Sequence, residues 1–117
     1  MKSHRNVSSS QEALAERNLF TALALLRNAD ECRAFFRDLC TPAEIQAMAD
    51  RWAVVDWLMR GVAYREINRL TGVSVTTISR VARCLAAGNG GYSLILRRAK
   101  GPRRADPGRR VEAARHG

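Results

Sequence analysis

Residues 60–85 read RGVAYREINRLTGVSVTTISRVARCL, and this stretch decides the fold. Its apolar pattern predicts two short helices joined by the turn Thr71-Gly72-Val73. Gly72 can take a positive φ at little cost, which suits the end of the first helix. Ser74 is a good N-cap for the second helix, because its hydroxyl can accept a hydrogen bond from a free backbone N–H. We therefore predict a helix-turn-helix over about residues 61–85.

Each of the two predicted helices has an apolar face. In the first, over about 64–70, Ile67 and Leu70 lie three residues apart. In the second, over about 75–85, spacings of three and four define an inward stripe of Val75, Ile78, Ala82 and Leu85. The residues left to face outward are polar or basic: Thr76, Thr77, Ser79, Arg80 and Arg83. No acidic residue interrupts this outward face.

The outward face has the chemistry of a DNA-reading surface. Arg can donate two hydrogen bonds to guanine, Ser and Thr can bond phosphates or base edges, and a Thr methyl can contact a thymine methyl. We expect Arg65 and Arg69 to contact phosphates and the second helix to read bases. The predicted DNA-contacting set draws on both helices and the turn: Tyr64, Arg65, Arg69, Ser74, Val75, Thr76, Thr77, Ser79, Arg80 and Arg83. The alternative is a helical hairpin whose polar side is only solvated.

Charge is distributed unevenly along the chain. Its 117 residues are enough for one small domain, and 46% of them are hydrophobic, as in an ordinary globular core. The net charge is +9, yet residues 1–60 hold eight Lys/Arg and eight Asp/Glu, whereas residues 61–117 hold twelve and three. Positive charge from the helix-turn-helix onward favours a polyanionic partner, although a solvated basic tail would give the same pattern.

Several other classes of function find no support in the sequence. Cys32, Cys40 and Cys84 form no CxxC pair, and His4 and His116 lie near the ends, so we expect no metal site. No catalytic Ser/His/Asp set, carboxylate pair or phosphate-binding Gly loop is recognisable, so we do not expect an enzyme. No apolar run could span a bilayer, and the first residues are too polar for a signal peptide. We expect a reduced, cytoplasmic protein.

The N-terminal half is predicted to contain three further helices. Residues 1–10 have the composition of a flexible arm, and helices are expected over about 11–27 and 30–39. The sequence Thr41-Pro42-Ala43-Glu44 is a strong start for the third helix, which should run to about Arg60. Thr41 can cap it, Pro42 has the φ required at the first helical position, and Glu44 can complete a capping box.

The third helix is apolar on two sides. Its apolar residues form two roughly opposite stripes, with Ile45, Met48, Trp52, Val55 and Met59 on one and Ala47, Val54 and Leu58 on the other. In a domain this small, one helix-turn-helix can cover one stripe but leaves little for the second. We therefore predict a homodimer with a shared core that includes the N-terminal helices. The alternative is that these helices fold back and cover both sides within one chain.

The chain is predicted to change character after Leu85. The sequence Gly88-Asn89-Gly90-Gly91 favours a turn, which ends the second helix of the motif. Residues 92–96 are a short apolar segment that could be helical or extended, because so few residues do not separate the two periods. They complete a domain over residues 11–96. Residues 97–117 are rich in Arg, Gly, Pro and Ala and predict a disordered basic tail.

Several motifs in these elements resemble the Trp-repressor superfamily, and in particular its YerC/YecD-type branch. They occur from the end of the second helix to the glycine-rich turn: Leu39-Cys40-Thr41-Pro42-Ala43-Glu44, Ala49-Asp50-Arg51-Trp52, Arg60-Gly61, Tyr64-Arg65-Glu66-Ile67, Thr77-Ile78-Ser79-Arg80 and Gly88-Asn89-Gly90-Gly91-Tyr92. The last of them points to the YerC/YecD-type branch. The resemblance covers about residues 15–96. It implies an all-α, Trp-repressor-like fold that forms an intertwined homodimer and regulates transcription.

The resemblance also implies where a corepressor would bind. In the tryptophan repressor the indole lies between two arginines beside a Thr-Pro corner, and the matching residues here are Arg51, Arg80 and Thr41. Two departures argue against tryptophan: Val81 replaces a glycine and narrows the slot, and Cys84 replaces a serine with a poorer hydrogen-bond partner. We expect no cofactor, with Arg51 and Arg80 in ion pairs or on phosphates. Tryptophan or another small aromatic corepressor is the alternative.

Together these expectations describe a homodimeric, sequence-specific DNA-binding regulator. Its partners would be double-stranded DNA and a second copy of the chain, with no membrane or metal. Two reading helices related by a two-fold axis would enter successive major grooves about 34 Å apart, so the operator should be roughly palindromic. The alternative is a helical protein-interaction module that binds DNA only non-specifically, through its basic tail. Sequence preference separates the two, because retention driven by charge alone has no motif.

Overall fold

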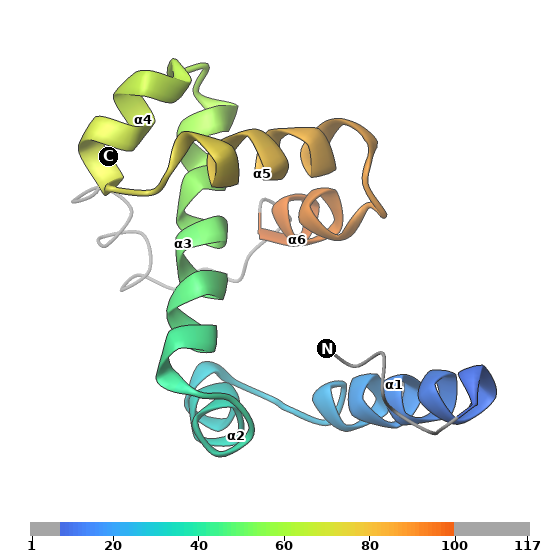
Figure 1. The fold of residues 1–117 in the computed structure, drawn as a ribbon. Coiled ribbons are helices and arrows are strands. Elements are labelled where there is room, and N and C mark those ends of the chain that lie inside the picture. The colour runs from blue at the N-terminus through green and yellow to red at the C-terminus, as the bar shows by residue number, and fades with distance from the viewer. Residues whose placement is uncertain (1–7, 100–117) are drawn as a thin grey trace. The chain divides into compact units, whose positions relative to one another are not determined.

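The computed structural model describes residues 8–99 and is all helical over that range (Figure 1). The helices follow one another in the order α1 Ser9–Leu23, α2 Ala29–Leu39, α3 Pro42–Met59, α4 Tyr64–Thr71, α5 Val75–Ala87 and α6 Gly91–Ala99. The chain divides into an N-terminal unit up to Gln46 and a C-terminal unit from Ala47 onward. The predicted all-α class is therefore confirmed. Most of the predicted arm and tail, including His4 and His116, lies outside the described residues.

Helix α1 in the N-terminal unit begins and ends earlier than the sequence pattern predicted. The Ser8 hydroxyl accepts from the Gln11 N–H at 3.1 Å, and the Gln11 side chain accepts from the Ser8 N–H at 2.9 Å. This capping box starts α1 at Ser9, inside the stretch predicted to be a loose arm. The helix ends at Leu23 rather than Arg27, because the following N–H groups bond three residues back, as Leu25 does to Ala22.

Helix α2 begins at Ala29, one residue before its predicted start, and α3 begins at Pro42, as its capping signal indicated. The Asn28 side chain caps α2 by accepting from the Glu31 N–H at 2.9 Å. At the start of α3 the predicted capping box is present: the Glu44 N–H donates to the Thr41 hydroxyl at 3.1 Å, and the Thr41 N–H donates to the Glu44 carboxylate at 2.8 Å. Helix α3 then runs to Met59, within one residue of the expected end.

Helix α4, the turn and helix α5 follow the predicted order. Helix α4 ends at Gly72, whose φ of +81° is the left-handed conformation that the turn requires. The Thr71 hydroxyl donates to the Ile67 carbonyl at 2.7 Å and accepts from the Val73 N–H at 3.0 Å. The Asn68 amide donates to the Val73 carbonyl at 2.8 Å. These three bonds fix the direction in which α5 leaves the turn.

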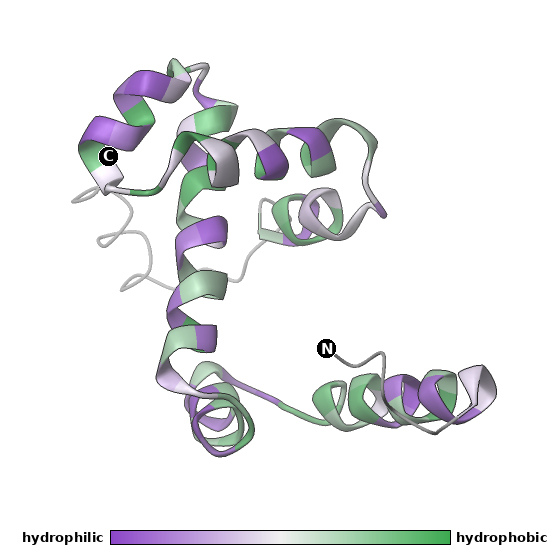
Figure 2. Cartoon of the chain, viewed as in Figure 1, coloured by the Kyte–Doolittle hydropathy of each residue, from purple (hydrophilic) through white to green (hydrophobic). Residues whose placement is uncertain are grey.

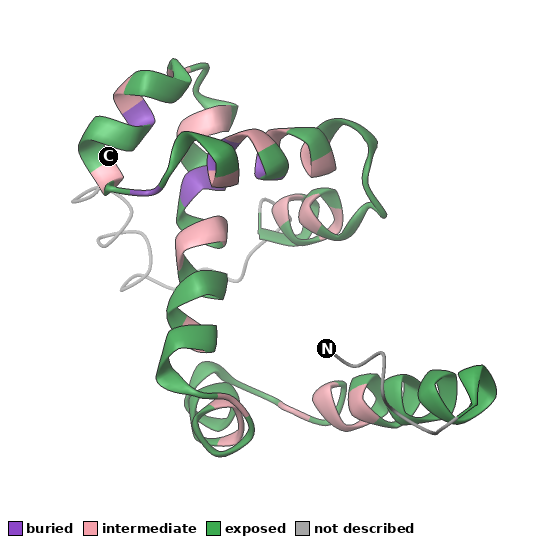
Figure 3. Ribbon diagram, in the orientation of Figure 1, coloured by how far each residue is buried: buried purple, intermediate pink, exposed green. Residues whose placement is uncertain are grey.

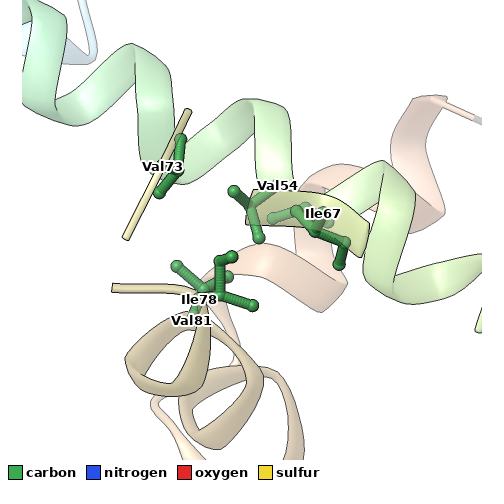
Figure 4. Close-up of a cluster of buried hydrophobic side chains, with 6 residues drawn as sticks. Val54, Ile67, Val73, Ile78 and Val81 are labelled. Carbon is green, nitrogen blue, oxygen red and sulfur yellow. The ribbon is translucent and has the colours of Figure 1, made fainter. Parts of the chain in front are cut away.

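The core of the C-terminal unit is small and entirely hydrophobic (Figure 4). It gathers side chains from α3, α4, the turn and α5: Val54, Val55, Ile67, Val73, Ile78 and Val81. Within residues 8–99, Figure 3 shows the fully buried positions only in these segments. Half-buried residues close the edges of the core, among them Leu58 of α3, Leu85 of α5 and Leu96 of α6. This core holds α5 across α3.

The structure corrects the predicted inward stripe of α5. Val81 is 1% exposed and lies in the core, whereas Val75 is 45% exposed. Each three-residue step along a helix rotates the side chain by about 60°, so Val75 and Val81 flank Ile78 on opposite sides. Only the Val81 side meets α3. The expectation that Leu70 shares the apolar face of Ile67 is also wrong, because Leu70 is 44% exposed.

Helix α6 settles the conformation of residues 92–96, which are helical. Helix α5 continues two residues beyond Leu85 before it ends, and Gly90 then turns the chain with a φ of +84°. Helix α6 packs beside α5 (Figure 1). The Tyr92 ring stacks on Trp52 of α3, with ring centroids 6.2 Å apart and planes at 19°. Since α6 runs through Ala99, the first residues of the predicted tail are helical.

Candidate nucleic-acid interface

The start of α5 is organised by two hydroxyl groups. The Ser74 hydroxyl accepts from the Thr77 N–H at 3.1 Å, which caps the helix as predicted. Ser74 also shares a hydrogen bond of 3.1 Å with the Thr77 hydroxyl. Thr77 is half-buried. Both hydroxyls therefore have partners within the chain, although sequence reasoning had placed both residues among the DNA contacts.

The outward side of α5 forms an open hollow. It is lined by six of the predicted contact residues: Val75, Thr76, Thr77, Ser79, Arg80 and Arg83. Thr76, Arg80 and Arg83 are exposed, and Ser79 is half-buried. On a helical wheel, Thr76, Ser79, Arg80 and Arg83 occupy an arc of about 100°, opposite the side that faces α3. The structure thus places Thr76, Ser79, Arg80 and Arg83 on one face of α5, whereas Thr77, also predicted to read bases, lies outside this arc.

Helix α4 supplies the remaining predicted contacts. Tyr64 is its first residue and is 40% exposed, and Arg65 next to it is also exposed. Arg69 forms an ion pair with Glu66 one turn earlier, with its Nε donating to Oε1 at 3.0 Å. This hydrogen bond lowers the pKa of the Glu66 carboxyl and raises the pKa of Arg69. Arg69 would have to exchange this partner to contact a phosphate.

The electrostatic character of this surface follows from the sequence. Residues 67–105 contain no Asp or Glu, so α5 and α6 carry only neutral and positive side chains. Glu66, the acidic residue of α4, is neutralised by Arg69. Arg80 and Arg83 therefore project positive charge from α5 with no acidic neighbour on the same helix. Such a face attracts phosphates and raises the rate at which a polyanion encounters it.

The residues of the predicted corepressor site fall in both units. Thr41 lies in the N-terminal unit, where its hydroxyl caps α3. Arg51 and Arg80 lie in the C-terminal unit, the first half-buried on α3 and the second exposed on α5. Val81, expected to narrow the ligand slot, has its side chain in the hydrophobic core, and Cys84 is half-buried. Within residues 8–99 neither Arg51 nor Arg80 forms an ion pair.

Sequence reasoning missed the residues that hold α5 in place. Asn68 ties α4 to the turn, and the Trp52–Tyr92 stack joins α6 to α3. The role of Asn68 had a weak signal in the sequence, because an Asn side chain near the end of a helix often hydrogen-bonds to the backbone of the following turn. Trp52 and Tyr92 lie 40 residues apart, and no periodicity relates them.

In the range 8–99 no three His, Cys, Asp or Glu side chains are grouped so that they could hold a metal ion. The three cysteines are free, with Cys32 exposed and Cys40 and Cys84 half-buried. Over the same range no helix has the length and apolar character needed to cross a bilayer.

Solved structures of other proteins share this fold. A Trp repressor-like protein from Staphylococcus aureus superposes with a TM-score of 0.70 at 37% identity, covering 84% of this chain and 100% of the other. A TrpR-like protein from Eubacterium eligens ATCC 27750 gives a TM-score of 0.71 at 35% identity, covering 83% and 100%. The chain therefore has a Trp-repressor-like, all-α fold.

Sequence comparison identifies the family. Residues 15–100 match the family model of the Trp repressor protein. The chain is also 46% identical over 82 residues to the YerC protein of Bacillus subtilis (strain 168), covering 70% of this chain and 79% of YerC. The chain belongs to the Trp repressor family. Membership of this regulatory family indicates a DNA-binding regulator of transcription.

Proposed function

We propose that the protein is a sequence-specific DNA-binding transcriptional regulator that acts as a homodimer through a helix-turn-helix formed by α4 and α5. The observation that carries this proposal is the outward face of α5. It presents Thr76, Arg80 and Arg83 to solvent, has no acidic residue, and is held by a buried core on its other side. A side chain that reads a base must be held at a defined position, and this arrangement supplies that rigidity.

Each exposed group on the two helices has a distinct part in the proposal. Arg65 at the start of α4 contacts a phosphate and sets the register of the protein on the duplex. Arg69 does the same once it leaves Glu66. Thr76, Ser79 and Arg80 contact base edges, and Arg83 contacts either a base or a phosphate. Ser74 and Thr77 fix the start of α5, because their hydroxyls bond to each other.

Exposed apolar residues support the homodimer. Neither α1 nor α2 contains a buried residue, although large hydrophobic side chains occur on both (Figures 2 and 3). Leu25, which follows α1, is 74% exposed, and Met59 at the end of α3 is 58% exposed. Apolar surface of this extent is typical of an interface between subunits. A two-fold axis would then place two α5 helices about 34 Å apart, matching successive major grooves.

We also propose that DNA binding requires no aromatic corepressor. Thr41, the first residue of the expected pocket, already uses its hydroxyl to cap α3. The thiol of Cys84 is a poorer hydrogen-bond partner than the serine of the tryptophan repressor, which disfavours an indole site. Arg51 and Arg80 are then available for phosphates and bases.

One selection experiment tests the proposed function. The purified protein is incubated with a randomised duplex library near physiological salt, with and without tryptophan, and the retained DNA is sequenced. We expect a palindromic motif with half-sites about one helical turn apart, enriched equally in both conditions. A motif that appears only with tryptophan would contradict the corepressor-independent mode. Retention without a motif would contradict sequence-specific binding.

A truncation separates the regulator from the alternative interaction module. Residues 100–117 hold six Lys/Arg and two Asp/Glu, and a chain ending at Ala99 retains all six helices of the described part. We expect the truncated chain to select the same motif, with weaker binding to every DNA and a smaller dependence of affinity on salt. Loss of all DNA binding in this variant would favour a protein-interaction module that holds DNA through its tail.

A further inference from the structure

Val75 is an apolar side chain on the face of α5 that the proposed function assigns to DNA. It is the first residue of α5 and is 45% exposed, whereas Ile78 and Val81 on the same helix are 0% and 1% exposed. It lines the open hollow together with Thr76, Ser79 and the two arginines of α5. Its exposure is therefore specific to the surface that would face the groove.

The polar groups next to Val75 are already engaged. The Ser74 hydroxyl, on its N-terminal side, bonds to the Thr77 N–H and to the Thr77 hydroxyl. The first turn of α5 thus presents an isopropyl group and the side chain of Thr76, while the hydroxyls of Ser74 and Thr77 are hydrogen-bonded to each other. The first turn is also the part of a reading helix that reaches furthest toward base edges in helix-turn-helix proteins.

The major groove offers one kind of apolar partner for such a side chain. Phosphates and the edges of all four bases present hydrogen-bonding groups there, and thymine alone also presents a C5-methyl group beside its O4 acceptor. A valine side chain can neither donate nor accept a hydrogen bond, so an isopropyl placed over a polar edge would remove water without replacing it. Over a thymine methyl, both groups lose contact with water, which is favourable.

We propose that Val75 is a specificity-determining residue that contacts the C5-methyl group of one thymine in each half-site. This inference rests on the proposed function, because it requires α5 to enter the major groove. It predicts that the selected motif contains a thymine opposite the first turn of α5, and that the methyl group of that thymine contributes to affinity.

Deoxyuridine provides the test, because it differs from thymidine only by the missing methyl group. Each thymine of the selected half-site is replaced in turn, and the dissociation constant is measured for the full-length wild type and for Val75→Ala. With the wild type we expect one position at which deoxyuridine weakens binding about fourfold per half-site. With Val75→Ala the same replacement should change affinity by less than about 1.5-fold.

Thr76→Ser is the matched control, since it removes a methyl group from the neighbouring residue and keeps the hydroxyl. This variant should retain the fourfold sensitivity to deoxyuridine. Both positions are exposed, and thermal unfolding of each variant establishes that it is folded before binding is measured. The inference is overturned if the sensitivity persists in Val75→Ala, if it disappears in Thr76→Ser, or if no thymine in the motif is sensitive. If the protein selects no motif, the proposed function fails and this inference fails with it.

Discussion

The N-terminal and C-terminal units of this chain are stabilised in different ways. Helices α1 and α2 have well-formed N-terminal caps but contain no buried residue. The C-terminal unit has the shorter α4, which lacks a side-chain cap, yet Ile67 on that helix is completely buried. Local hydrogen bonds thus determine where the N-terminal helices begin, whereas tertiary packing holds the C-terminal helices together. The comparison teaches that the C-terminal unit has a hydrophobic core of its own, whereas α1 and α2 leave their apolar side chains exposed or half-buried.

The largest expected effect tests the core of the C-terminal unit. Ile78→Ala should lower the free energy of unfolding by about 2–5 kcal/mol, because it leaves a cavity where α5 meets α3. Val75→Ala on the same helix is the matched control and should change it by less than about 0.5 kcal/mol, since Val75 is exposed. Urea unfolding of both variants gives the comparison. Equal losses of unfolding free energy in the two variants would mean that Ile78 and Val75 do not differ in how far they are buried.

The second prediction concerns the N-terminal unit and its dependence on a second copy. Phe20 on α1 is 55% exposed, and Phe20→Asp would place a carboxylate in the proposed subunit interface. We expect the dissociation constant of the homodimer to rise at least about tenfold. Sedimentation equilibrium measures it. Ser10→Asp adds the same charge to the first turn of α1 and should leave the dimer intact, so an equal effect of both variants would count against an interface at Phe20.

The third prediction tests whether the C-terminal unit recognises a particular DNA sequence. Arg80→Ala should weaken binding to the selected operator by about 1–3 kcal/mol and relax its sequence preference. Binding to random duplex should change less, which fluorescence anisotropy with both DNAs can measure. Arg33→Ala removes an exposed arginine from α2 in the N-terminal unit and serves as the control. An equal loss on operator and random DNA would assign Arg80 to phosphates only.

The fourth prediction compares a helix cap in each unit. Ser74→Ala removes the hydroxyl that accepts from the Thr77 N–H and should lower global stability by about 0.5–2 kcal/mol. Ser8→Ala removes the equivalent cap of α1, which has no buried residue to link it to the core. We expect Ser8→Ala to speed amide exchange in the first turn of α1 without shifting the global transition. A global loss from Ser8→Ala would show that the N-terminal unit unfolds together with the C-terminal one.

The smallest expected effect is a pH dependence in α4. The hydrogen bond from Arg69 lowers the pKa of Glu66 in the folded state. Its contribution to stability is therefore present above the unfolded pKa of a glutamate and is lost as the pH falls through the lower, folded value. The pair is exposed, so the effect should be slight. Glu66→Gln should remove this part of the pH dependence, and an unchanged pH profile would indicate that the pair contributes nothing in solution.

The same contrast explains which elements the sequence could predict. Thr41-Pro42-Ala43-Glu44 identified the start of α3 because its capping bonds involve residues three apart. Ser8 and Gln11 form the same kind of box, but the serine-rich composition around them suggested a loose arm. Local signals are thus sufficient for helix boundaries when the capping pair is recognised.

Features that depend on distant segments were harder to predict. Val75, Ile78 and Val81 are equally spaced, so periodicity alone cannot say which pair faces the core; the position of α3 decides it. For the candidate site, the outward residues of α5 were predicted because they share one helix. The bond from Asn68 to the turn before α5 spans five residues, and the Trp52–Tyr92 stack joins α3 to α6, so neither follows from the pattern of α5 itself.

The Trp52–Tyr92 stack also gives the molecule a built-in optical probe. The chain has two tryptophans, and they occupy different surroundings. Trp52 stacks on a ring from α6, whereas Trp57 lies under the guanidinium of Arg60, the residue that follows α3, 5.1 Å from the ring centroid. Detachment of α6 would remove the ring that stacks on Trp52 and so alter the emission of that tryptophan. In a Trp57→Phe variant, Trp52 is the one remaining tryptophan, and its fluorescence would report whether α6 is packed against α3, without any attached dye.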